Sequence, residues 1–573
     1  MKPASLPSVP ASTICASVLS RRRFLANSLL ASAAANLGGA AGPSVQAAPA
    51  SDADDIFRKN SARKRRDAAY RLRQDAAEAH LRTPLVDHLD NHDEELHPNF
   101  IGNYSKGLPH NELGEVDPSA YHALLRALAT RHPRDFEAIP LGAPAGHARK
   151  LVNPQAGLAF DLEGADSHGL TQRPAPALCS PEAAGEMLEN YWAALARDIP
   201  FSEYPSNPLI RIAAADLSRL PTFRGPKVNR RVTPETLFRG PHAGCLNGPY
   251  ISQYLWLTPP FGAVYVHTKV RTTRRGLNFM TRFEDWLAIQ RGHQPREVAA
   301  YDDTRRYLRN ARDLGEWVHI DVLYQAYFQA LLILLAGPSS DSASSGLAAP
   351  LNPGNPYLQS RNQDGFGTFG PPHIAALLAE VSSRALKTVW FQKWFVHRRL
   401  RPEAYAGRVH LHLSEAADYP LDWNSLAPSP ALTALKELNR TWLLPMAYPE
   451  GSPLHPAYGA GHATVAGACV TILKAWFDEN FVLPNPVQAT PDGRALVPYS
   501  GPPLTLGGEL NKLANNVAIG RNLAGVHWRS DATESLKLGE AVAISILRDQ
   551  KATYNEPFNG FTFTRFDGSR ITV

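Results

Sequence analysis

The chain has 573 residues, too many for one small hydrophobic core. Its formal charge of +6 comes mostly from the first fifty residues, which hold Lys2, Arg21, Arg22 and Arg23 and no acidic residue. The rest of the chain is nearly neutral, which removes the main argument for nucleic-acid binding. Since no run of about twenty apolar residues follows without polar interruptions, we also expect no membrane span.

The N-terminal leader carries its own signal. Residues 20–26 read SRRRFLA and precede a run rich in Ala, Leu and Gly, and small residues near Ala47 suit an A-x-A-like cleavage site. This leader resembles a twin-arginine export signal. We predict that residues 1–50 are a signal peptide and that the mature protein is periplasmic or secreted, in a bacterium. An Arg-rich disordered tail is the alternative.

Three cysteines, Cys179, Cys245 and Cys469, remain after such a leader is removed. An oxidising compartment permits one disulfide. The expected pair is Cys179 and Cys245, because Cys469 lies in an apolar, helix-like run. The spacings give no metal-binding motif.

Most periodic segments predict helices. In chain order they are residues 61–81, 319–337, 371–402, 462–481 and 530–547. Stretches rich in Pro and Gly at 337–356 and 484–508 predict long irregular connections. We therefore predict a helical region over 51–336, a linker or loop over 337–360 and a C-terminal helical bundle over 361–573.

Residues 87–97 read DHLDNHDEELH, in which His88, His92 and His97 stand near several acids. These side chains have the chemistry to hold a divalent ion, but they follow no tight ligand spacing. We expect a solvated polar loop.

Arg401 lies eight residues after Lys393 and directly before Pro402. Eight residues are a little over two helical turns, so both cations are predicted on nearly one helix face, with Pro402 ending the helix. An ordinary basic helix end, favoured by the helix dipole, is the alternative.

Residues 455–469 read HPAYGAGHATVAGAC. The turn Gly459, Ala460 and Gly461 leaves backbone amides open to a ligand, and His462 opens a helix. A small-residue turn at a helix N-terminus is a natural anion cradle. A tight packing turn is the alternative.

Residues 520–531 read GRNLAGVHWRSD. His527 and Asp531 are four apart and would share one helix face, whereas Arg521 would reach the same place only from a preceding bend. A capped, solvated helix start is the alternative. Combined with the two preceding stretches, this one completes an inventory for binding a tetrahedral oxyanion, with a histidine left to act on its centre.

Taken in order, Lys393…Arg401-Pro402, Gly459-Ala460-Gly461-His462 and Arg521-x5-His527-x3-Asp531 resemble the motifs of the vanadium-dependent haloperoxidases and of their relatives, the acid and lipid phosphatases. The step of eight from Lys to Arg is similar to that of the algal and cyanobacterial bromoperoxidases, as are residues 102–118 and 362–370. The resemblance covers the chain from about residue 66 to its end.

The resemblance implies an all-α fold of two four-helix bundles with long irregular loops and a vanadate site at the end of one bundle. His527 would be the axial nitrogen ligand to vanadium. Lys393, Arg401 and Arg521 would neutralise the equatorial oxygens, helped by the Gly461 amide.

Further roles follow from the same resemblance. His462 would be the acid–base group, and Asp531 would orient His527 or its helix. Trp390 would wall the pocket. His455 stands where the algal enzymes have His and the fungal chloroperoxidases have Phe, which implies a preference for bromide and iodide over chloride.

The implied reaction is oxidation of bromide or iodide by hydrogen peroxide to hypohalous acid, which halogenates small organic substrates. Lys393 would polarise the peroxide. Family members are commonly homo-oligomers, so we expect one here. One alternative is an acid phosphatase, in which His527 attacks phosphorus to give a phosphohistidine. The other is a non-catalytic exported oxyanion-binding protein, which would have little need of His462.

Gly459 and Ala460 depart from the family pattern, which has Pro and Ser. The family Ser donates a hydrogen bond to vanadate, and losing a bond to a charged group costs roughly 1.5–3 kcal/mol. We expect weaker vanadate binding as a result. Residues 362–370 lie where the algal enzymes have a calcium-associated loop, but Asp364 is their only acid. An Asp-Gly turn is expected there, with calcium as the alternative.

Overall fold

The computed structural model describes residues 52–337 and 345–573. The chain divides into two compact units, residues 1–73 and 74–573, and of the first the structure describes only part of helix α2 (Asp52–Arg82). The predicted signal peptide lies outside the described residues, as do residues 338–344 of the predicted linker. Both flanks of that linker belong to the second unit, and the division at 337–360 stays a prediction.

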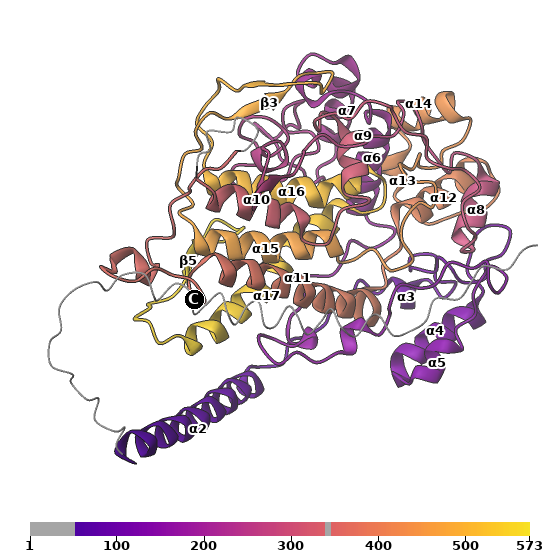
Figure 1. Ribbon diagram of the computed structural model, residues 1–573. Helices are drawn as coiled ribbons and strands as arrows, with labels where there is room; N and C mark the ends of the chain where they lie inside the picture. Colours follow the sequence, from indigo (N-terminus) through magenta and orange to yellow (C-terminus); the bar gives the residue numbers. More distant parts are fainter. Residues whose placement is uncertain (1–51, 338–344) are drawn as a thin grey trace, which may run out of the picture. The chain divides into compact units, whose positions relative to one another are not determined.

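The second unit is predominantly helical, as predicted, with long irregular connections (Figure 1). The helices of its first half are α3 (Asp93–Leu96), α4 (Pro118–Thr130), α5 (Pro133–Glu137), α6 (Pro181–Leu195), α7 (Pro208–Ser218), α8 (Phe283–Gln290), α9 (Ala311–Trp317) and α10 (Gln325–Leu335). The later helices are α11 (Pro371–Phe391), α12 (Pro402–Leu413), α13 (Trp423–Leu426), α14 (Pro430–Asn439), α15 (Gly461–Trp476), α16 (Leu506–Leu523) and α17 (Arg529–Thr553).

Strands are short and pair as antiparallel hairpins in the described residues. They are β1 (Pro260–Phe261) with β2 (Val264–Tyr265), β3 (Val487–Ala489) with β4 (Leu496–Pro498), and β5 (Thr562–Thr564) with β6 (Arg570–Thr572). The middle pair places Gln488 opposite Val497. None of the described helices is long and apolar enough to cross a membrane.

Proline begins several of these helices. Pro118 follows Asp117, whose carboxylate accepts backbone N–H groups of the first turn of α4, and Pro181 follows Ser180, whose hydroxyl caps α6 in the same way. The fixed φ of Pro suits the first helical position, where its missing N–H costs nothing. Many of the prolines that first indicate loops therefore mark helix starts.

The innermost bundle consists of α11, α15, α16 and α17, with α15 in contact with the other three (Figure 1). Gly467 on α15 and Gly539 on α17 face the backbone of the other helix so closely that an added Cβ would collide with Leu536 O or Thr464 O. The two glycines let these helices cross at close range. The two-bundle description of the whole fold stays a prediction.

The segment around Lys393 differs from the prediction of one continuous helix. Helix α11 ends at Phe391, a π-helical turn covers Gln392–His397, and Arg398 adopts a left-handed conformation with φ 39°. Pro402 then begins α12 instead of ending a helix, because Pro is favoured at the first helical position. Lys393 and Arg401 are therefore not on one helix face.

The structure also differs from the sequence predictions at the start of α10 and at the cysteines, and it shows the contacts of the polar loop over residues 87–97. The helix predicted over 319–337 is shorter, since α10 begins only at Gln325. Cys179, Cys245 and Cys469 are free thiols, so the predicted Cys179–Cys245 disulfide is wrong: Cys179 is exposed while Cys245 is buried. In residues 87–97, His88 Nε2 contacts His168 O at 2.9 Å, and the buried Asp93 accepts the N–H of Leu178.

Candidate functional site

Arg401 lies at the centre of the predicted site, one residue before α12. Its Nη1 donates to Val526 O at 2.7 Å and to His527 Nε2 at 3.0 Å. Its Nη2 lies 2.8 Å from His455 O and 3.0 Å from His455 Nδ1. The guanidinium is buried, which lowers its pKa to about 10. One side chain thus connects the turn before α17 with the turn before α15.

Lys393 reaches the same turn from the π-helical segment. Its Nζ donates to Pro456 O at 2.7 Å and to Ala457 O at 3.2 Å, and it is fully buried. Burial, followed by the charge of Arg401, holds the pKa of this ammonium well below its usual value. The π-helical turn and the left-handed Arg398 redirect the chain, so two cations eight residues apart converge from different directions.

Arg521 comes from the last turn of α16, as the bend at Gly525 (φ +87°) requires. Its Nη1 donates to Val318 O at 2.8 Å, and its guanidinium lies 5.4 Å from the centre of the Tyr448 ring. Its Nε is buried and has no hydrogen-bond partner within residues 52–337 and 345–573. A buried donor of this kind can be satisfied by a water molecule or by a bound anion.

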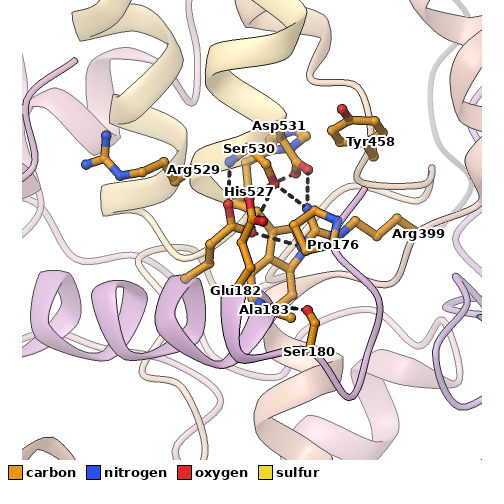
Figure 2. A network of polar contacts seen from close by, with 12 residues as sticks. Pro176, Ser180, Glu182, Ala183, Arg399, Tyr458, His527, Arg529, Ser530 and Asp531 are labelled. Carbon is orange, nitrogen blue, oxygen red and sulfur yellow. Dashed lines mark hydrogen bonds and ion pairs between the residues drawn. The ribbon is translucent and has the colours of Figure 1, made fainter. Parts of the chain in front are cut away.

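His527 is held by Asp531. The two residues are not on one helix, since α17 begins only at Arg529. Asp531 Oδ2 instead accepts both His527 Nδ1–H at 2.8 Å and the N–H of Trp528 at 3.1 Å (Figure 2). A proton on Nδ1 leaves the lone pair on Nε2, which accepts from Arg401 Nη1. Burial and the nearby cations hold the pKa of His527 well below its usual value, so the imidazole is neutral.

The negative charge of Asp531 is already shared. Its Oδ1 accepts from Arg399 Nη1 at 2.9 Å (Figure 2). Arg399 also pairs with Glu186 at 2.9 Å. Arg399 stacks over Trp528, 4.6 Å from the ring centre. Sequence reasoning missed Arg399, because nothing in HRRLRP distinguishes one arginine from the next.

His455 and Trp390 form a wall. Their ring centres are 4.8 Å apart, and Trp390 lies 5.6 Å below Lys393 Nζ. A Cβ added to Gly461 would lie 3.1 Å from the Trp390 ring. Burial, followed by the charge of Lys393, holds the pKa of His455 well below its usual value. Trp390 therefore borders the turn where the sequence predicts an anion cradle.

The cradle itself is the start of α15. Gly461 is the first residue of the helix, so its backbone N–H has no partner inside the helix. The N–H of Ala460 is taken, since it donates to Ser535 Oγ at 2.8 Å. The same Ser535 oxygen occupies the space into which a Cβ at Gly459 would extend. Ser535 on α17 thus leaves no room for a Cβ at position 459, where this chain has Gly and the family pattern has Pro.

His462 is paired with a residue that sequence reasoning missed. Its Nε2 lies 3.0 Å from Asp321 Oδ1, and its side chain is 31% exposed, so a diffusing substrate can reach it. Asp321 follows Val318, which binds Arg521, so one segment before α10 meets both residues. Asp321 is the only acid in the apolar run 319–337, where the sequence predicts a helix, and this isolated charge is the one local sign of its role.

The three cations, His455, His527 and Asp531 therefore lie in one buried cluster. Gly461 borders this cluster beside Trp390, and His462 is joined to it through the segment that carries Asp321 and Val318. Lys393, Arg401 and Arg521 are buried, and in the described part of the chain their hydrogen-bond partners are carbonyl oxygens, imidazoles and the Tyr448 hydroxyl. Buried charges are costly unless they are compensated. The cluster is suited to a bound anion with several oxygens.

Comparisons with known proteins agree with this chemistry. Residues 421–556 match a family model described as the VCPO second helical-bundle domain. A vanadium-dependent bromoperoxidase of Corallina officinalis is 37% identical and covers 88% of this chain and 98% of its own. One of Ascophyllum nodosum is 35% identical and covers 91% and 94%. The homohexameric structure of a second vanadate-dependent bromoperoxidase from Ascophyllum nodosum has a TM-score of 0.82 and 32% identity and covers 95% of both chains.

Proposed function

Because the chain belongs to the vanadium-dependent bromoperoxidases, we propose that the buried cation cluster around Arg401 is where it binds vanadate and oxidises bromide with hydrogen peroxide. Membership makes the chain a bromide peroxidase that uses a vanadate cofactor. The assignment of individual residues is our proposal. The observation that carries it is a set of three buried cations, Lys393, Arg401 and Arg521, none of which has a carboxylate at ion-pair distance among the residues that the structure describes.

The residues fit vanadate. Among the described residues, Arg521 Nε and the N–H of Gly461 have no hydrogen-bond partner and can donate to the oxygens of an oxyanion, as can the third N–H of Lys393. The N–H groups of Arg401 bind Val526, His527 and His455 in this structure, so Arg401 would exchange one of these bonds for an oxygen of the anion. Asp531 holds the proton on Nδ1 of His527, so Nε2 would be the ligating nitrogen once Arg401 Nη1, which donates to it in this structure, turns to an oxygen of the anion. A neutral nitrogen ligand together with several cationic donors would suit an oxyanion with a metal at its centre.

Bound vanadate supplies a Lewis acid that activates hydrogen peroxide for attack by a halide without changing its own oxidation state. The chain contributes the rest. Lys393 and Arg401 hold positive charge where negative charge develops, and burial strengthens that interaction. Asp531 keeps His527 in the ligating tautomer, and Arg399 with Glu186 keeps Asp531 in place.

His462 is the proposed acid–base group. It is partly exposed, so it can accept a proton from incoming peroxide and return it to the departing oxygen. Asp321 Oδ1 lies 3.0 Å from its Nε2 and holds the ring in one orientation. His455 is the proposed source of halide preference, since its ring borders Lys393 and Trp390 and bonds to Arg401.

The test is metal analysis of vanadate-loaded protein, followed by bromination of a dione reporter with bromide and peroxide. We expect one vanadium per chain and bromination that requires both reagents. Hydrolysis of a phosphate monoester by the vanadate-free protein, without bromination by the loaded one, would favour the phosphatase. Retained vanadate without any turnover would favour the binding protein.

Assembly and location belong to the same proposal. The Ascophyllum nodosum neighbour is a homohexamer, which supports a homo-oligomer here; light scattering during gel filtration measures its size. The SRRRFLA stretch supports export by the twin-arginine route. Replacing Arg22 and Arg23 by Lys should retain the protein in the cytoplasm, and unchanged export would contradict this route. Calcium at residues 362–370 is testable by metal analysis of the same sample.

A further inference from the structure

A cavity of about 290 Å³ lies beside the site, and nothing in the proposed vanadate chemistry uses it. It is lined by the loop 267–271, by the end of α9 and by the segment before α10. Asp321 lines the cavity and also contacts His462. The cavity is therefore separated from the proposed acid–base group by one side chain. Its volume is near the lower end of the range for small-molecule pockets, which suits a ligand with a single ring.

The lining carries an excess of positive charge. Lys269, Arg271 and Arg305 face two acids, and both acids are already beside a basic group. Asp321 contacts His462, and Glu316 lies 3.8 Å from Arg271. Neither Lys269 nor Arg305 has a carboxylate at ion-pair distance in the part of the chain that the structure describes. The cavity thus favours an anionic ligand.

Glu316, which also lines the cavity, is suited to a hydrogen-bond donor and not to an anion. Glu316 is 3% exposed, and its Oε1 accepts no hydrogen bond among the described residues, since Arg271 Nη2 lies 3.8 Å away, too far for one. A buried acceptor without a partner is costly, and a ligand hydroxyl would satisfy it. Trp317 and Ile320 add apolar surface between the charged groups. Together these features favour a flat ligand that carries an anionic group and a hydroxyl.

We propose that this cavity binds the organic acceptor of the reaction and that the acceptor is a small phenolic acid. Its carboxylate would lie near Lys269 and Arg271, and its hydroxyl would donate to Glu316. The catalytic consequence rests on the proposed function. Hypobromous acid formed next to His462 would meet an electron-rich ring: a C–Br bond forms and the Br–O bond breaks. The oxygen leaves as hydroxide and takes the ring proton to give water.

The first test is binding to the vanadate-loaded enzyme by titration calorimetry without peroxide. The probe is 4-hydroxybenzoate. It is compared with benzoate, which lacks the hydroxyl, with phenol, which lacks the carboxylate, and with 4-methoxybenzoate, which lacks the donor hydrogen. We expect 4-hydroxybenzoate to bind at least tenfold more tightly than each of the three. Equal affinities for all four, or no saturable binding, would overturn the proposal.

The second test uses variants. Lys269→Met and Arg271→Gln should each weaken binding of 4-hydroxybenzoate at least fivefold and leave that of phenol unchanged. Arg275→Gln is the matched control, since Arg275 is exposed, lies on the same loop and does not line the cavity. Equal weakening by the control, or none by Lys269→Met, would refute the assigned site. Binding is measured without turnover. A failure of bromide oxidation by the wild type would therefore contradict the proposed function without deciding whether the cavity binds 4-hydroxybenzoate.

Discussion

Replacing Asp531 by Asn should weaken vanadate binding by roughly ten- to a hundredfold. Asp531 accepts from His527, Trp528 and Arg399 at once. An amide has one acceptor oxygen, so its NH₂ must face either Arg399 or His527. If it faces His527, it favours a proton on Nε2 and removes the ligating lone pair. A lost charge-assisted bond costs about 1.5–3 kcal/mol, and each 1.4 kcal/mol is a factor of about ten in affinity.

The matched control is Glu186→Gln. Glu186 is also buried and also pairs with Arg399, so the variant removes the same charge from the same network without touching His527. Both variants disturb a buried ion pair and should lose stability, so circular dichroism must first confirm a folded fraction near unity. Equilibrium dialysis then measures the vanadate dissociation constant. Unchanged affinity in Asp531→Asn, or the same loss in Glu186→Gln, would refute the orienting role.

Three further outcomes are expected. Ala460→Ser should tighten vanadate roughly tenfold, since about 1.4 kcal/mol of new hydrogen bonding is a factor of ten; a folded variant with unchanged affinity in dialysis would show that this side chain faces away from the anion. His455→Phe should raise the ratio of chloride to bromide turnover in the dione assay, and an unmoved ratio would exclude His455 as the source of halide preference. Burial lowers the pKa of His242 to about 4 from 6.5, so the unfolded state binds more protons between these values and stability should fall by up to about 3 kcal/mol as pH drops from 6.5 to 4. Urea unfolding should show a smaller fall in His242→Asn, and an equal fall would contradict this origin.

Much of the site could be predicted because its motifs are local. The turn at Gly461 followed by a helix, and the bend that separates Arg521 from His527, both follow from residue type and spacing. The path from Lys393 to Arg401 could not be predicted in this way. A π-helical turn changes the direction of side chains without any change in apolar periodicity, and Pro402 has two readings, as a stop or as a start.

Long-range partners were also beyond sequence reasoning. Asp321 meets His462 from 141 residues away, and the apolar run around it favoured a helix. The arginines of HRRLRP have different partners: Arg398 pairs with Glu94, Arg399 with Glu186 and Asp531, and Arg401 contacts the two histidines. Identical side chains a few residues apart give no local signal of which will face a carboxylate and which a ligand.

The crossing of α15 and α17 at Gly467 and Gly539 has a consequence for motion. Where backbones touch, two helices cannot slide or roll past each other without steric overlap, so their N-terminal ends keep a fixed separation. One end presents Gly461 and His462, and the other positions Asp531. We therefore expect loading and loss of the cofactor to use motions of side chains and of the irregular segments at the site, such as the 455–460 turn, which are faster than helix rearrangement. Hydrogen exchange would show this as slow amides along both helices beside a faster turn.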